Sequence, residues 1–167
     1  EALTSAGFDI EDLESNPNNE PTTPQNLETD VLVIGSGAAG LSAAIEAAEA
    51  GNDVIVIEKL TVYGGSTITS SGMVVVGGSK LQEEAGIEDS VEKLKEYWLG
   101  RGDQMVNEEK IGFVADNAND MRDWLMDSGI NYSAEGILYS GTADVPRAHI
   151  PPTFGLEFID RLYLRAE

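Results

Sequence analysis

The sequence predicts an α/β fold built on one parallel βαβ unit, and three neighbouring segments lead to this expectation. Residues 30–34 form a β-branched run typical of a strand buried on both faces. Residues 38–51 are rich in strong helix formers and end on a glycine, which favours a helix with a C-terminal stop. Residues 53–58 form a second apolar run, so strand, helix and strand follow one another within about 30 residues.

The composition excludes several classes of function. A hydrophobic content of 41% is sufficient for a folded core. The formal charge of -20, from 30 acidic against 10 basic residues, argues against nucleic acid and anionic membranes, because binding to either needs concentrated Lys and Arg. Without cysteine, and with His149 as the single histidine, no thiolate or multi-histidine metal site is expected. No stretch approaches the roughly 20 apolar residues that span a bilayer.

The chain divides into two segments of different character. Residues 1–29 carry seven acidic side chains and no Lys or Arg, and Pro21 and Pro24 interrupt helix formation. We predict an acidic linker or N-terminal arm at 1–29, in which residues 6–15 are expected to form a short helix packed on the body of the domain. Residues 30–167 are expected to be the N-terminal part of an α/β domain. Because the chain starts at Glu1 rather than Met, we expect that a signal segment or a preceding domain was removed.

Three later helices follow from periodicity. Helical spacing occurs at 88–102 and at 107–129, where Asn107 is a suitable N-cap and Gly129 a suitable C-terminal stop. One apolar stripe is expected on the second of these helices, formed by Ile111, Val114, Ala115, Ala118, Met121, Leu125 and Met126. Short strands are expected within 130–140, and residues 154–167 read as an amphipathic helix. Its apolar face is expected to stay uncovered in this chain, with Phe154, Phe158, Ile159 and Leu162 exposed.

Three glycines form a G-x-G-x-x-G pattern between the first strand and the first helix. Gly35 allows a tight turn, Gly37 lets the backbone approach a pyrophosphate, and Gly40 allows close packing of helix and strand. The free N–H groups at the helix start then face the phosphates, so an acidic chain binds an anion without local Lys or Arg. This context predicts a Rossmann-like nucleotide site, with a purely packing role of the glycines as the alternative.

Two further features favour FAD over other nucleotides. Glu58 ends the second strand, and a carboxylate there accepts hydrogen bonds from the adenosine ribose hydroxyls and repels a 2′-phosphate. Gly64 and Gly65 follow shortly and bring a second stretch of backbone N–H groups towards the pyrophosphate. The hydroxyl groups beyond them are in reach of phosphate, ribitol or ring edge, and they belong to Ser66, Thr67, Ser70 and Ser71. A polar surface loop is the alternative interpretation.

The stretches "GSGAAGLSAAIEAAEAG", "VIEK", "GGSTITSSGM" and "RAHIPP" resemble the FAD-dependent fumarate reductase and succinate dehydrogenase flavoprotein superfamily. The similarity is greatest to the soluble flavocytochrome-type fumarate reductases and their relatives acting on urocanate, other enoates or ketosteroids. It covers residues 30 to about 165 and is strongest over 30–73. In this chain Ser71-Gly72-Met73 stands where the family often has Ser-Gly-Gly or Ala-Gly-Gly.

The resemblance implies a distribution of FAD contacts along the chain. It places the pyrophosphate at Gly35, Ser36, Gly37, Ala38 and Ala39, the adenosine ribose at Glu58, and the adenine side near Lys59. It places the flavin against Gly65, Ser66, Thr67, Ser71, Gly72 and Met73. His149 is expected to be a hydrogen-bonded structural histidine or a contact to the flavin edge. Arg147 is expected to pair with a carboxylate rather than to contact substrate or flavin.

The resemblance also implies a reaction and partners. In this superfamily a hydride passes from flavin N5 to an activated alkene, and an arginine delivers the proton. We therefore expect the catalytic residues downstream of residue 167, and as partners the remainder of the FAD domain, a substrate-capping domain and an FMN or haem electron donor. The alternatives are a dehydrogenase or oxidase of a steroid or amino acid, and a non-catalytic nucleotide-binding module. An exported bacterial location, periplasmic or at the cell surface, is favoured over a cytoplasmic one.

Overall fold

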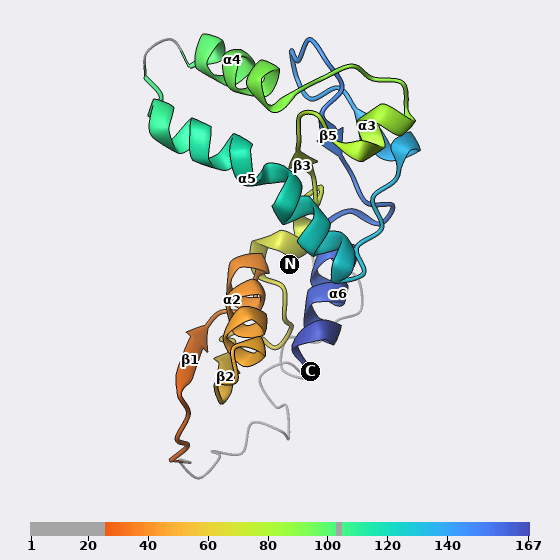
Figure 1. The fold of residues 1–167 in the computed structure, drawn as a ribbon. Coiled ribbons are helices and arrows are strands. Elements are labelled where there is room, and N and C mark those ends of the chain that lie inside the picture. Colours follow the sequence, from red (N-terminus) through yellow and green to blue (C-terminus); the bar gives the residue numbers. More distant parts are fainter. Residues whose placement is uncertain (1–25, 103–104) are drawn as a thin grey trace, which may run out of the picture.

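The computed structural model describes residues 26–102 and 105–167, so the predicted arm and its short helix lie almost wholly outside the described residues. β1 (Val31–Ile34) and β2 (Val54–Ile57) pair in parallel, from Val31 opposite Val54 to Ile34 opposite Ile57. α2 (Ala38–Glu49) connects them, and Gly51 follows its C-cap at a φ of +90°, a value that favours glycine. The predicted βαβ unit is therefore confirmed (Figure 1).

The expectation that the first strand is buried on both faces is wrong. Leu32 is 54% exposed and Ile34 80% exposed, whereas Val31 and Val33 are half-buried. α2 packs against one face of the strand pair. Leu32 and Ile34, on the opposite face, stay largely exposed, so the β-branched run alternates between half-buried and exposed positions.

A second, antiparallel sheet has the strand order β3-β5-β4, formed by β3 (Val74–Val75), β5 (Ala148–His149) and β4 (Ile137–Leu138). β4 confirms the short strands expected within 130–140, and the short η3 helix (Ala134–Gly136) precedes it. β3 and β5 were not predicted, because two-residue strands have no measurable period. β3 is defined only by its pairing with β5, more than 70 residues away, whereas β5 pairs with both β3 and the nearby β4.

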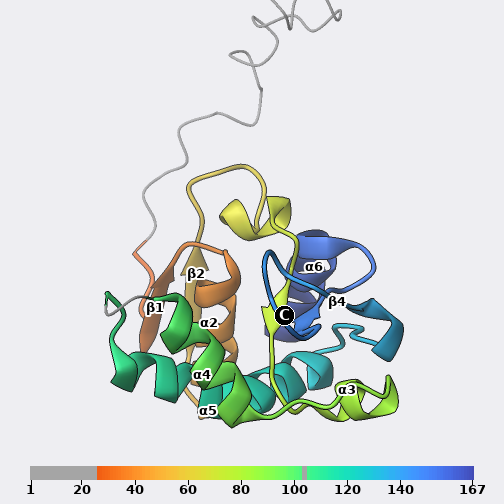
Figure 2. The same ribbon diagram turned by 90° about the horizontal axis from the view of Figure 1, so that it is seen from above.

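α3 (Lys80–Glu84), α4 (Val91–Arg101) and α5 (Glu108–Asp127) follow β3, and Figure 2 shows them along one side of the molecule. The side chain of Asn107 accepts from the Lys110 N–H, so the predicted N-cap of α5 is confirmed. The predicted apolar stripe is only partly correct. The buried face of α5 is Ala115, Ala118, Arg122 and Leu125, whereas Val114, Met121 and Met126 are exposed. The buried face therefore includes an arginine, Arg122, which the apolar pattern of the sequence does not mark.

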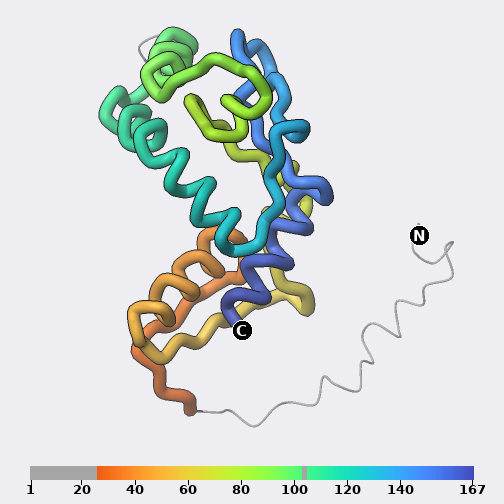
Figure 3. Tube along the Cα trace, turned by 45° about the vertical axis from the view of Figure 1, so that its right-hand side comes forward, coloured from red at the N-terminus to blue at the C-terminus, as the bar shows by residue number. Residues whose placement is uncertain are grey.

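α6 (Phe154–Ala166) returns the chain to the βαβ unit and packs along α2 and on η2 (Gly65–Thr69), as Figure 3 shows. The expectation of an uncovered apolar face on α6 is wrong for Ile159 and Leu162, which are fully buried in the core with Leu41, Ile45 and Leu125. Of the four named residues Phe154 alone is largely exposed, and Leu156 and Leu164 on the same helix are exposed as well. No described helix combines the length and the apolar character that a bilayer crossing requires.

Candidate cofactor site

The turn after β1 is built by close backbone contacts. Gly35 has a φ of +101°, and its N–H donates to the Ile57 carbonyl at 2.7 Å, which ties the turn to the end of β2. A Cβ at Gly40 would overlap the Gly35 carbonyl oxygen, so only glycine lets α2 start this close to β1. These contacts agree with the roles that the sequence assigns to the first and third glycines.

The N-terminus of α2 has free hydrogen-bond donors. Gly37 is the N-cap and supplies no side chain, and the first turn contains no acidic residue. The Ala38 N–H donates to Thr67 Oγ1 at 3.1 Å. Within the described residues the N–H groups of Ala39 and Gly40 have no acceptor. Free N–H groups and the positive end of the helix dipole together favour an anion here.

The second glycine loop lies directly beside the first. The Gly64 N–H donates to Ser36 Oγ at 3.1 Å, and a Cβ at Gly65 would stand only 3.6 Å from the Gly37 Cα. Gly64 and Gly65 have φ values of +111° and +51°, so both adopt backbone that favours glycine. The structure therefore brings together the two glycine segments that the sequence singled out.

Glu58 joins three segments through its carboxylate. Oε2 accepts from the Ser36 hydroxyl at 2.6 Å and from the Ser36 N–H at 2.9 Å, and Oε1 accepts from the Leu60 N–H at 3.0 Å. The Ser36 hydroxyl bond, followed by those from the Ser36 and Leu60 N–H groups, lowers the pKa of Glu58 from 4.5 to about 2. A carboxylate offers about four acceptor positions, so capacity remains for one further donor such as a ribose hydroxyl.

The lowered pKa of Glu58 predicts a pH-dependent contribution to stability. Because the folded pKa lies below the unfolded value, the contribution is complete above about pH 4.5 and is lost as the pH falls towards 2. We expect Glu58→Gln to lower the thermal unfolding midpoint at neutral pH, and the difference from the unaltered protein to shrink over that interval. The exposed Glu84 provides the control, Glu84→Gln. A midpoint difference that stays constant with pH would contradict this origin of the effect.

The other predicted contact residues lie along one continuous segment. Lys59, Ser66 and Ser71 are exposed, and Met73, directly before β3, is 39% exposed. Gly72 is buried, with a φ of +61°, and a Cβ there would stand 2.8 Å from the Phe154 carbonyl oxygen. The segment thus begins beside Gly37 and ends beside the start of α6.

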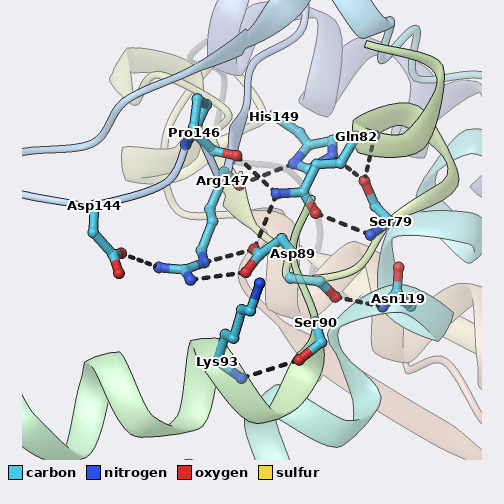
Figure 4. A network of polar contacts seen from close by, with 11 residues as sticks. Ser79, Gln82, Asp89, Ser90, Lys93, Asn119, Asp144, Pro146, Arg147 and His149 are labelled. Carbon is cyan, nitrogen blue, oxygen red and sulfur yellow. Dashed lines mark hydrogen bonds and ion pairs between the residues drawn. The ribbon is translucent and has the colours of Figure 1, made fainter. Parts of the chain in front are cut away.

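Arg147 and His149 lie in a buried polar network (Figure 4). Arg147 is 1% exposed and forms a bidentate ion pair with Asp89, from Nε at 2.7 Å and from Nη2 at 2.8 Å. Its Nη1 also donates to Asp144. The expectation that Arg147 pairs with a carboxylate is confirmed. The partner was not identified from sequence because the two residues are 58 positions apart.

Both ring nitrogens of His149 have protein partners. Nδ1 donates to the Arg147 carbonyl at 2.9 Å, because that oxygen only accepts, and Nε2 then accepts from the Ser79 hydroxyl at 2.8 Å. Burial, with a smaller effect of the charge on Arg122, lowers the pKa of His149. The hydrogen bonds favour the structural interpretation of His149, and a contact to the flavin edge stays a prediction.

A capping box at the start of α3 was missed in the sequence. The Ser79 hydroxyl accepts from the Gln82 N–H, and the Gln82 side chain accepts from the Ser79 N–H. The Ser-x-x-Gln pattern that identifies this motif is visible at 79–82. Gln82 also donates to Asp89, so the motif orients the carboxylate that pairs with Arg147.

An apolar groove of about 570 Å³ opens next to Met73. Its lining comes from β3, α4 and α5 and includes no charged side chain: Met73, Val74, Val75, Trp98, Phe113, Val114, Asn117, Ala118 and Met121. Among the described residues no group of three or more His, Cys, Asp or Glu side chains is placed to hold a metal ion.

Comparisons with known proteins agree with this geometry. A profile of the FAD binding domain family matches residues 30–152. The chain is 36% identical over 131 residues to a urocanate reductase of Eggerthella lenta, which covers 77% of this chain and 22% of the relative. It is 35% identical over 137 residues to a probable fumarate reductase of Shewanella frigidimarina, covering 80% of this chain and 23% of the relative. The chain thus spans about a quarter or less of the length of these relatives.

Two solved structures share the fold. The open conformation of a flavocytochrome c3 fumarate reductase matches with a TM-score of 0.74 and 32% identity, over 95% of this chain and 28% of that one. A 3-ketosteroid-Δ4-(5α)-dehydrogenase from Rhodococcus jostii matches with a TM-score of 0.78 and 30% identity, over 87% of this chain and 37% of that one. The chain therefore belongs to the FAD binding domain family, within the superfamily of fumarate reductase and succinate dehydrogenase flavoproteins, and its cofactor is FAD.

Proposed function

We propose that this chain is the FAD-binding portion of an oxidoreductase that reduces an activated alkene, such as fumarate or another enoate. The observation that carries the proposal is the meeting of the two glycine segments and Glu58 at the uncapped start of α2. The similarity to a urocanate reductase and to a probable fumarate reductase supports the class of substrate.

Two observations indicate that the start of α2 suits the phosphates of FAD. Gly37 places no side chain over the start of α2, and the N–H groups of Ala39 and Gly40 have no acceptor among the described residues. A diphosphate supplies the oxygen acceptors that such groups bind. Ser36 has a different role, because its N–H and hydroxyl are already bonded to Glu58.

In the proposed reaction, the bound flavin, once reduced by an electron donor, would supply a hydride from N5 to one alkene carbon and return to oxidised FAD. The residues of this chain contribute binding and orientation. Ala39 and Gly40 hold the pyrophosphate, Glu58 holds the adenosine ribose, and the segment 65–73 lies along the flavin. We propose that the proton donor and the substrate clamp come from other parts of the full protein, as a remaining FAD-domain segment and a capping domain.

A dehydrogenase of a steroid is the second candidate. The groove beside Met73 is apolar and of a size comparable to small-molecule pockets, which suits an apolar ring system better than a dicarboxylate. The similarity to a 3-ketosteroid dehydrogenase supports this alternative.

One experiment separates these candidates. The full-length protein is purified, its cofactor is extracted and identified, and reduced viologen oxidation is followed with fumarate, urocanate and acrylate. A separate assay uses a 3-ketosteroid with a dye as electron acceptor. We expect FAD and turnover of at least one enoate. Turnover of the steroid alone would select the second candidate, and a protein without flavin would contradict both and leave the non-catalytic module. Export from the cytoplasm, and an FMN or haem donor, stay predictions.

A further inference from the structure

Tyr132 is a buried tyrosine whose hydroxyl contacts the end of the segment 65–73. It lies between α5 and η3, is 3% exposed, and its hydroxyl donates to the Gly72 carbonyl at 3.1 Å. Burial, and to a smaller degree the charge on Glu157, raises the pKa of the Tyr132 phenol. The phenol therefore stays protonated at neutral pH and remains a hydrogen-bond donor.

Gly72 is confined on a second side as well. At its φ of +61° a Cβ would stand 2.8 Å from the Phe154 carbonyl oxygen and 3.0 Å from Pro151 Cγ. Phe154 is itself at a φ of +56°, which is uncommon for a residue other than glycine. The start of α6 and Tyr132 together fix the plane of the peptide that joins Gly72 to Met73.

The direction of the Met73 N–H follows from this peptide plane. The described residues contain no cis peptide bond, and in a trans peptide the carbonyl and the next N–H point in opposite directions. With the Gly72 carbonyl directed at Tyr132, the Met73 N–H is directed away from Tyr132.

The register of the second sheet independently gives the same direction for the Met73 N–H. Val74 is opposite His149, and the Val76 N–H donates to the Arg147 carbonyl at 3.0 Å. In an antiparallel pair alternate residues bond to the partner strand, so the N–H of Met73 points away from β5. β3 is an edge strand, and among the described residues the Met73 N–H has no acceptor.

We propose that Tyr132 is a positioning residue that holds the Gly72–Met73 peptide so that the Met73 N–H donates a hydrogen bond to the isoalloxazine ring of FAD. This inference rests on the proposed function, in which the segment 65–73 lies along the flavin. Tyr132 acts through the peptide and not by touching the reacting atoms. Hydrogen bonds in a chain polarise one another, so the phenol strengthens the Met73 N–H as a donor.

The test compares the FAD-loaded full-length protein with Tyr132→Phe, which removes only the hydroxyl. The control is Tyr139→Phe, because Tyr139 is 65% exposed. We expect the reduction potential of the bound flavin to become more negative in Tyr132→Phe, since a donor to the electron-rich reduced ring is weakened. We also expect FAD to bind more weakly, by at most about fivefold, the effect of losing one hydrogen bond completely. The control should match the unaltered protein in both measurements.

A second variant keeps the test decisive where Tyr132→Phe does not fold. Incorporation of 3-fluorotyrosine at position 132 makes the phenol a stronger donor at nearly constant size, and we expect a shift of the potential to less negative values. An unchanged potential in folded Tyr132→Phe, or in the fluorinated protein, would overturn the positioning role and leave the proposed function standing. If the unaltered protein bound no FAD at all, the proposed function would fail, and this inference with it.

Discussion

Gly37→Ala is expected to leave the fold intact and to weaken FAD binding by about a hundredfold. Gly37 has a φ of -71° and a ψ of 178°, which any residue adopts, and a Cβ there would stand 3.7 Å from Thr67 Oγ1 and 3.8 Å from the Gly64 carbonyl oxygen. These are ordinary contacts, so the protein itself accommodates the methyl group. The methyl group would instead stand over the start of α2 and keep the diphosphate from the N–H groups of Ala39 and Gly40. Two charge-assisted hydrogen bonds of about 1.5 kcal/mol each account for the loss.

The measurement is a fluorescence titration of the apoprotein with FAD. Gly112→Ala is the matched control, because a Cβ at Gly112 in α5 would meet no atom within 4 Å. We expect the control to bind FAD as the unaltered protein does. Equal affinity of Gly37→Ala and the control would show that the phosphates do not approach this helix start.

Arg147→Met is expected to lower the stability by about 3–5 kcal/mol, the largest effect on folding that we predict. The side chains of Arg147 and Asp89 are 1% and 0% exposed, so removing the guanidinium leaves a carboxylate buried without its partner. Burial alone would raise the pKa of Asp89, but the hydrogen bonds from Arg147 and Gln82 keep it below its ordinary value. The measurement is the urea midpoint of unfolding, followed by tryptophan fluorescence.

Arg122→Met is the contrasting variant. Arg122 is also buried, but its ion-pair partner Asp123 is 53% exposed, and Nη1 of Arg122 has no hydrogen-bond partner among the described residues. Removing this side chain leaves no buried charge behind, so we expect a change of less than about 1 kcal/mol in either direction. Equal losses for the two arginine variants would contradict the importance of the Arg147–Asp89 pair.

Features with local causes were predictable from the sequence. The βαβ unit, the two glycine turns and the N-cap at Asn107 each depend on residues within a few positions of one another. The nucleotide site could be inferred for the same reason, because Gly35, Gly37 and Gly40 act through the backbone of one turn. Their convergence with Gly64 and Gly65 was also expected, and the structure adds the hydrogen bond from the Gly64 N–H to Ser36 Oγ that joins the two turns.

Features that depend on distant partners were not predictable. β3 is two residues long, and only its pairing with β5, more than 70 positions away, defines it. The exposure of Ile34 and the burial of Ile159 depend on which surfaces other segments cover, which a period of two or of 3.6 does not encode. The bond from Ser36 to Glu58 spans 22 positions, so the sequence revealed the carboxylate but not its role in joining three segments.

Hydrogen exchange at the start of α2 provides a direct test of whether the N–H groups of Ala39 and Gly40 bind the phosphates of FAD. The amide protons of Ala39 and Gly40 have no acceptor among the described residues, so in the apoprotein they should exchange fast. We expect saturating FAD to slow exchange at these two amides and in the loop around Gly64 and Gly65. Unchanged exchange at Ala39 and Gly40 in the FAD-saturated protein would contradict this binding.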